Sequence, residues 1–259
     1  MKFNSDNINF SLKTLDKSNG DSFYINLYNK KIKFNINELT YKWVSEYKRN
    51  IKPQSDDLLK KFNHADPKSF LIIFYIYKYI LPDFNFIYNL LPNKNDKVLE
   101  IGSGIGFFAN ILYQLFDGDI ELNLVEVIKN EDHCSNFRND DDENFREEQK
   151  KYSIHTLEYL KDFITLNKIK ANIFSPNELR KSNISNINYI YSFRSYCFLY
   201  EIEEYSTFLR SAMAPDSKII CDVSKSLLQV EKFKKEFFYK KTLGENDYFE
   251  RIFAMKNFM

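Results

Sequence analysis

The sequence predicts an α/β fold built on a doubly wound, mainly parallel sheet. After Pro92, short apolar runs typical of buried strands alternate with segments of helical spacing, and this alternation indicates crossover connections between parallel strands. Three of the chain's 6 glycines stand at 102, 104 and 106, directly behind the first of these runs. Near the C-terminus, two strand-like runs flank the turn sequence GEND, which predicts an antiparallel hairpin.

In the N-terminal third, the apolar residues are spaced differently. Residues 23–36 alternate apolar and polar positions on both sides of the turn sequence NKK, residues 29–31, a pattern that predicts a hairpin. From about residue 37 to 91 the spacing is helical, and Pro82 is expected to close one of the helical segments. We therefore divide the chain into an N-terminal hairpin and helical cap, residues 1–91, and a sheet domain, residues 92–259.

The elements of the sheet domain follow from the same patterns. The predicted strands are 97–102, 120–127, 171–174, 188–193 and 218–223, and the predicted helices are 106–116, 154–168, 201–213 and 224–235. With the terminal hairpin, the strands number seven. The charged run 139–151 predicts a solvated loop or helix face, and its position after the second strand also allows a mobile flap.

Composition and charge argue against several classes of protein, namely those that bind nucleic acid or anionic lipid, are secreted or span a membrane. The 259 residues carry 37 basic and 36 acidic side chains, so no net field attracts nucleic acid or anionic lipid. Three widely spaced cysteines indicate no disulfide framework, and the N-terminus lacks a secretion signal, so we expect a cytoplasmic protein. The apolar run 70–81 falls short of the roughly 20 residues that a membrane span needs and predicts a buried helix.

The three glycines lie in the turn from the first strand into the first helix. In doubly wound sheets a nucleotide binds at this turn, where the backbone approaches the ligand at a helix N-terminus. We expect Gly104 to pass directly beneath the ligand, so that a methyl group at that position would collide with it. A dinucleotide fingerprint would require a glycine where Phe107 stands, and no Gly-Lys-Ser/Thr of an ATP-type phosphate loop follows, so both of those classes are disfavoured.

The stretch resembles motif I of the class I S-adenosylmethionine (SAM)-dependent methyltransferases, E/D-x-G-x-G-x-G. The matching or adjoining positions, to which the resemblance assigns cofactor contacts, are Glu100, Gly102, Ser103, Gly104, Gly106 and Phe107. The resemblance covers roughly residues 92–259 and implies a Rossmann-like sheet of strand order 3-2-1-4-5-7-6 with the last hairpin antiparallel. It also implies SAM as the cofactor. A tight strand–helix turn without a ligand is the alternative reading of the motif.

Further positions extend the resemblance. Glu126 ends the second strand, 20 residues after Gly106, where an acid can accept hydrogen bonds from both hydroxyls of a ribose; a surface acid is the simpler reading of that residue alone. Ser175 stands where the family usually has an acid beside the adenine, so the sequence departs from the pattern there. Ser192 and Phe193, at the end of the fourth strand, correspond to the family's positions facing the methyl group.

The candidate catalytic residues follow from the chemistry of the transfer. Transfer to an alcohol requires a general base to take the hydroxyl proton. We assign the proton transfer to His133 or Tyr196 and the binding of an anionic substrate to Arg194; a surface or packing role is the alternative for each. His155 and His64 are further histidines to which either role could apply. Only Asp222 is well placed to bind a metal, so we predict a mechanism without one.

We predict methyl transfer from SAM to a small polar acceptor. The overall layout is similar to that of sugar O-methyltransferases of bacterial capsule and other surface-polysaccharide biosynthesis. One alternative is methylation of a phosphate or phosphoramidate group for the same polysaccharides. Another is a cofactor-binding scaffold with the fold and no turnover. Nucleic acid is not expected as a partner, and the oligomeric state is left open.

Overall fold

A computed structural model of the chain describes residues 11–13, 21–47, 67–126, 156–193, 195, 202–225, 229–247 and 249–256. Its main sheet has seven strands in the order β6-β5-β4-β7-β8-β10-β9. These are β4 (Lys97–Ile101), β5 (Glu121–Val125), β6 (Ala171–Phe174), β7 (Ile187–Ser192), β8 (Met213–Ser224), β9 (Phe238–Glu245) and β10 (Phe249–Met255). Counted along the chain from β4, this is the order 3-2-1-4-5-7-6. The first five strands pair in parallel, and β10 is antiparallel to both β8 and β9, so the predicted fold class is confirmed.

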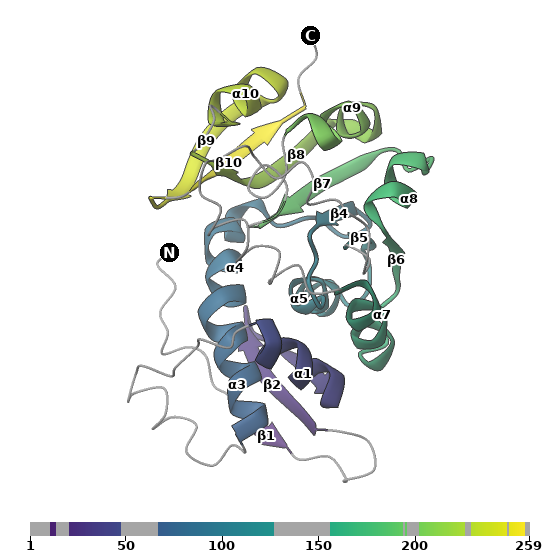
Figure 1. Ribbon diagram of the computed structural model, residues 1–259, viewed down its shortest axis with the longest axis vertical. Helices are drawn as coiled ribbons and strands as arrows, with labels where there is room; N and C mark the ends of the chain where they lie inside the picture. The colour runs from purple at the N-terminus through teal and green to yellow at the C-terminus, as the bar shows by residue number, and fades with distance from the viewer. Residues whose placement is uncertain are drawn as a thin grey trace.

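Helices cover both faces of this sheet. On one face lie α5 (Phe107–Leu115) and α7 (Thr156–Leu166), and on the other α8 (Pro176–Lys181), α9 (Glu203–Ala212) and α10 (Gln229–Glu236). In Figure 1 the second group lies above the sheet and the first below it. Neighbouring strand residues such as Val98 and Leu99 point into separate hydrophobic clusters on the two faces, which explains why β4 is apolar at nearly every position.

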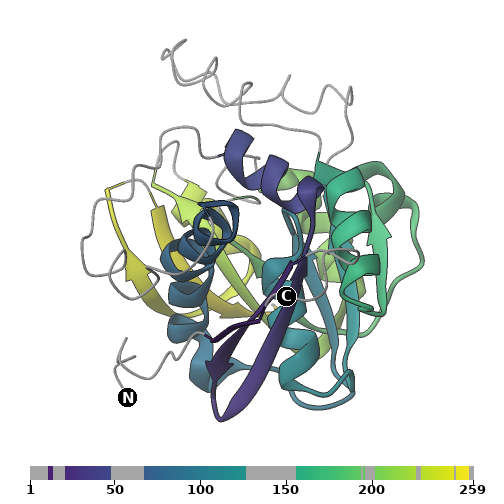
Figure 2. The same cartoon turned by 90° about the horizontal axis from the view of Figure 1, so that it is seen from below.

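The predicted N-terminal hairpin is present. β2 (Asp21–Leu27) and β3 (Lys30–Ile36) pair antiparallel, and β1 (Ser11–Lys13) adds a third strand beside β2. The turn residues Tyr28 and Asn29 both have positive φ, 52° and 64°, as a two-residue turn between strands of this twist requires. Figure 2 shows the hairpin in purple, crossing the lower side of the molecule.

The hairpin is attached to the sheet domain by backbone and side-chain hydrogen bonds. Gln114 of α5 accepts a bond from the Lys33 N–H (2.7 Å) and donates one to the Lys33 carbonyl (2.6 Å). Asn167, just after α7, makes the same pair of bonds with the backbone of Asn35, at 2.8 and 3.0 Å. Because the apolar residues of β2 and β3 share one cluster with those of α5, the hairpin packs as an integral layer. The division of the chain at residue 91 stays a proposal.

The helical segment of the cap comprises α1 (Glu38–Tyr47), α3 (Pro67–Tyr75), the π-helix η2 (Ile76–Ile80), α4 (Leu81–Ile87) and the 3-10 turn η3 (Tyr88–Leu90). The expectation that Pro82 closes a helix is wrong, because the helix continues through it. The Leu81 N–H bonds to the Ile76 carbonyl, five residues back. This wider turn lies immediately before Pro82, where a regular helix would clash with the proline ring.

The apolar run forms a longer helix than predicted. The helix Lys68–Ile87 contains an 18-residue window of mean hydropathy 1.4 that is long and apolar enough, by length and composition, to cross a membrane, but 50% of that window is buried inside the protein. Ile72, Ile76 and Phe84 lie in the same hydrophobic cluster as α5. This burial is typical of a core helix, the structure predicted for the run.

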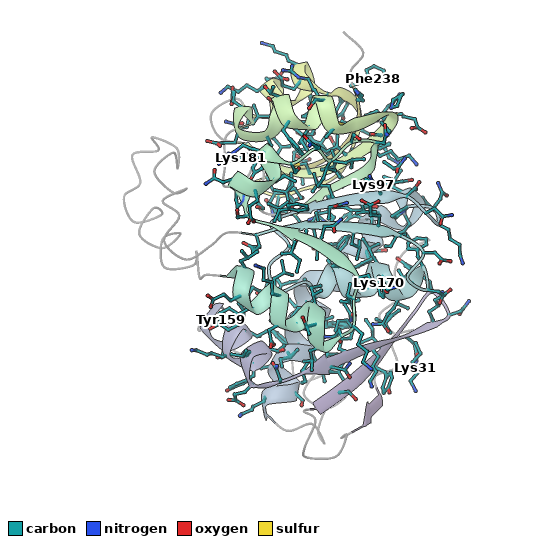
Figure 3. The ribbon with its side chains drawn as sticks, turned by 90° about the vertical axis from the view of Figure 1, so that its right-hand side faces the viewer. Lys31, Lys97, Tyr159, Lys170, Lys181 and Phe238 are labelled. Carbon is teal, nitrogen blue, oxygen red and sulfur yellow. The ribbon has the colours of Figure 1, made fainter. Side chains whose placement is uncertain are left out.

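Two boundaries differ from the predictions. β8 begins at Met213, five residues before the predicted strand. The short helix α8 was not predicted, although Ser175 and Glu178 form a reciprocal capping box at its start, with Pro176 as its first residue. Figure 3 shows the extent of the molecule, from Lys31 on the hairpin at one end to Phe238 on β9 at the other, with the sheet between them.

Candidate functional site

The glycine turn is fixed to the second strand by its backbone. The N–H groups of Gly102 and Ser103 both donate to the Val125 carbonyl, at 2.9 and 3.1 Å. The Ser103 hydroxyl donates back to the Glu100 carbonyl at 3.1 Å, and the Gly106 N–H donates to the Ser103 carbonyl at 2.9 Å. The turn therefore has a single, well-determined path between β4 and α5.

All three glycines adopt left-handed backbone conformations, with φ of 78° at Gly102, 55° at Gly104 and 95° at Gly106. Two of them are also closely covered by protein. A Cβ on Gly102 would lie 2.2 Å from Ser195 Cβ, and one on Gly106 would lie 2.9 Å from Leu160 Cδ1 on α7. At Gly102 protein packing leaves no room for a side chain, whereas at Gly106 the end of the Leu160 side chain would have to shift.

Gly104 is covered by a residue that the sequence did not single out. A Cβ built there would lie 3.5 Å from Trp43 Cζ2 and 3.6 Å from Cη2, which is ordinary van der Waals contact. The Cβ direction of Gly104 thus faces Trp43, and the expectation that a methyl group there would collide with a ligand stays a prediction. No local pattern marks Trp43; it is a buried position of α1, 61 residues before Gly104.

Glu126 lies where the sequence predicted, directly after β5. Its Oε2 accepts a hydrogen bond from the Gly104 N–H at 2.5 Å, and its own N–H donates to the Phe174 carbonyl at 3.1 Å. The carboxylate is thus held against the glycine turn at the carboxyl ends of β4 and β5. In open α/β sheets ligands bind at these strand ends.

A second carboxylate, that of Glu100, is buried beside it. Glu100 is 5% exposed, and among the described residues its Oε2 has no hydrogen-bond partner. Burial raises the pKa of Glu100 well above its ordinary value, and the nearby Glu126 and Asp83 raise it further. A buried acid without a donor is costly, and a cationic or hydrogen-bond-donating ligand would offset that cost.

The other predicted cofactor positions are engaged in bonds within the protein. The Ser175 hydroxyl accepts the Glu178 N–H as the N-cap of α8, so its local bonding explains the serine without an adenine. The buried Ser192 hydroxyl donates to the Ile101 carbonyl at 3.0 Å and joins the ends of β7 and β4. Phe107, 1% exposed, packs in the core at the start of α5.

Phe193 lies at the end of β7 against a buried charged cluster. Its ring centroid is 4.5 Å from the Arg251 guanidinium. Arg251 forms a two-pronged ion pair with Asp222, at 2.6 and 2.8 Å, and a third bond to Asp83 on α4 at 2.8 Å. Burial alone would lower the pKa of Arg251, but the two aspartates outweigh it and hold the pKa above its ordinary value.

This cluster contains Asp222, the one residue that the sequence placed well for binding a metal. Both carboxylate oxygens of Asp222 contact the Arg251 guanidinium. In the part of the chain that the structure describes, no group of three or more His, Cys, Asp or Glu side chains could hold a metal ion. The predicted catalytic residues His133, Arg194 and Tyr196, and likewise His64 and His155, lie outside the described residues, so their roles stay proposals.

Comparisons with known proteins found similar solved structures but no matching family model or curated sequence. Among solved structures it is similar to a SAM-dependent methyltransferase from Aquifex aeolicus, at 13% identity over 78% of this chain and 100% of that one, with a TM-score of 0.49. A methyltransferase from Pyrococcus furiosus shares 16% identity over 68% of this chain and 82% of its own, with a TM-score of 0.45.

A third similar structure is a 16S rRNA methyltransferase from T. thermophilus in complex with AdoMet and guanosine. It is 13% identical over 91% of this chain and 50% of its own length, with a TM-score of 0.46. At such identities and TM-scores the likeness concerns the fold alone, and the activity has to be argued from the residues of this chain.

Proposed function

We propose that this chain is a SAM-dependent methyltransferase acting on a small polar acceptor. The observation that carries the proposal is the pairing of two acids with the glycine turn: Glu126 bonded to the Gly104 N–H at 2.5 Å, and buried Glu100 with an Oε2 that lacks a partner among the described residues. The surrounding sheet has the strand order and the antiparallel β10 that the resemblance implied.

The residues fit this cofactor chemically. SAM carries a sulfonium and an ammonium group as well as two ribose hydroxyls, so two carboxylates at the turn supply acceptors for donors of both kinds. Glu126 would hold the ribose hydroxyls, and Glu100 would gain a cationic neighbour that favours its ionised form. When bound, SAM would supply a methyl group already activated for transfer.

The protein's task is then to align and deprotonate the acceptor. Alignment of the two reactants makes the step effectively unimolecular and can lower the barrier by about 7–11 kcal/mol. We assign the proton transfer to His133 or Tyr196, and the binding of an anionic acceptor to Arg194. Ser192 and Phe193, which end β7, would lie on the acceptor side of the cofactor.

The acceptor we propose is a hydroxyl of a sugar or of a sugar-linked group, as in surface-polysaccharide (capsule) biosynthesis. Methylation of a phosphate or phosphoramidate group is the alternative that Arg194 would suit. The near-neutral net charge of +1 supports a small molecule over RNA, because binding a nucleic-acid backbone requires a basic surface.

The experiment is a turnover assay that follows S-adenosylhomocysteine release. The acceptor panel contains nucleotide sugars, phosphorylated sugars and, as the competing class, RNA. Product with a sugar acceptor supports the proposal, and product with RNA alone overturns the acceptor class. Tight SAM binding with no product on any acceptor favours the scaffold alternative.

A further inference from the structure

Trp43 stands out because it belongs to the cap and yet contacts the glycine turn. It lies on α1, outside the seven-stranded sheet, and is 2% exposed. Its ring edge lies 3.5 Å from the position that a Cβ on Gly104 would occupy. The same glycine donates its N–H to Glu126, so the indole and the carboxylate meet at one residue.

The distance between the Trp43 indole and Gly104 limits where a ligand could lie at the turn. Because a Cα–Cβ bond is about 1.5 Å long, the indole edge is within about 5 Å of the Gly104 Cα. A ligand atom sandwiched between them would need about 7 Å, two van der Waals contacts of about 3.5 Å each. No ligand atom can therefore lie between the indole edge and Gly104, and a ligand held by Glu126 would meet the ring from the side.

Neighbouring aromatic rings hold the indole in place. The Trp43 ring meets Tyr75 edge to face, with centroids 5.6 Å apart at 90°, and Phe107 with centroids 6.5 Å apart at 83°. The N-terminus of α1 is fixed by Asn37, which accepts the Thr40 N–H at 3.0 Å and donates to Asp162 of α7 at 2.9 Å. The ring is thus set by contacts with α3 and α5, and the start of its helix by a contact with α7.

We propose that Trp43 is a cofactor-binding residue, forming the wall of the SAM site that the N-terminal cap contributes. The proposal rests on the proposed function, since it places Trp43 against the portion of SAM that Glu126 holds. It also assigns the cap a part in cofactor binding.

The chain offers a direct readout, because Trp43 is its only tryptophan. Intrinsic tryptophan emission of the unmodified protein therefore reports on this one side chain. We expect S-adenosylhomocysteine to change the emission saturably, with the dissociation constant that calorimetry gives for the same sample. Calorimetric binding without any change in emission would overturn the role of Trp43 while leaving the proposed cofactor intact. Absence of calorimetric binding would overturn both.

Two variants provide the second test. Trp43→Phe keeps an aromatic ring in the cluster but withdraws the indole edge from Gly104, and should raise the dissociation constant of S-adenosylhomocysteine by about threefold to tenfold. Tyr75→Phe alters the same cluster away from the turn and should leave that constant within about twofold. Equal effects of the two variants, with equal thermal stability, would contradict the proposal.

A reporter placed elsewhere excludes a global effect on emission. Phe238 on β9 is 54% exposed and lies at the opposite end of the molecule from the hairpin (Figure 3). In a Trp43→Phe, Phe238→Trp protein, saturating S-adenosylhomocysteine should leave the emission unchanged. An emission shift equal to that of the natural chain would show that the signal is not specific to position 43. It would contradict the proposed role of Trp43 in cofactor binding.

Discussion

Replacing Arg251 by methionine tests the buried cluster that joins the cap to the sheet. The substitution keeps an apolar stem but leaves Asp222, fully buried, and Asp83, 5% exposed, without their guanidinium. Removing one partner of a buried ion pair costs about 3–5 kcal/mol. That is a large share of the about 5–15 kcal/mol that a folded protein typically has, so we expect a strong loss of stability.

The assay is chemical denaturation followed by circular dichroism. The matched control is Arg210→Met, which removes a surface ion pair with Glu236 (2.7 Å; side chains 47% and 29% exposed) and should cost less than about 1 kcal/mol. Adding Asp222→Asn and Asp83→Asn to the Arg251 variant should restore part of its loss, because the neutral amides are cheaper to bury. Equal losses for Arg251→Met and Arg210→Met would refute the reasoning.

Three further predictions concern the turn. Gly102→Ala should prevent stable folding, because its Cβ would lie 2.2 Å from Ser195 Cβ; a normal thermal unfolding midpoint would contradict the packing described. Gly104→Ala should fold and lose only about 1–2 kcal/mol, the cost of a left-handed residue with a side chain, as measured by denaturation. Glu100→Gln should become increasingly more stable than the natural chain as the pH rises. Burial raises the pKa of Glu100 in the folded state, and the nearby carboxylates raise it further. The protonated form of Glu100 therefore stabilises the folded state, and this stabilisation is lost as the pH rises through that pKa. Denaturation at about pH 5 and about pH 8 measures this, and a constant difference would refute it.

Much of the fold could be predicted from local pattern. The strands of the sheet, the N-terminal hairpin and the glycine turn each have a signal within a few residues, because strand burial and turn geometry depend on near neighbours. The hairpin turn itself is formed by Tyr28 and Asn29 and begins one residue before the predicted turn sequence NKK. α8 also had such a signal, the capping box of Ser175 and Glu178.

The composition of the site was predicted only in part, for a physical reason. Glu126 was placed correctly at the end of β5, since its position depends on the strand that precedes it. The contacts of Gly102 with Ser195 and of Gly104 with Trp43 join residues far apart in the chain, and tertiary packing alone brings them together. The same holds for Arg251, whose two aspartates come from α4 and β8.

The central claim is that the glycine turn and Glu126 together bind SAM. The most direct test is calorimetric titration with S-adenosylhomocysteine of the natural chain, of Glu126→Ala and of Glu121→Ala, an exposed acid at the other end of β5. We predict one site per chain and a binding free energy weakened by about 1–3 kcal/mol, roughly 5-fold to 150-fold, in Glu126→Ala. Glu121→Ala should bind as the natural chain does. Unchanged affinity in Glu126→Ala, or no binding to the natural chain, would contradict the claim.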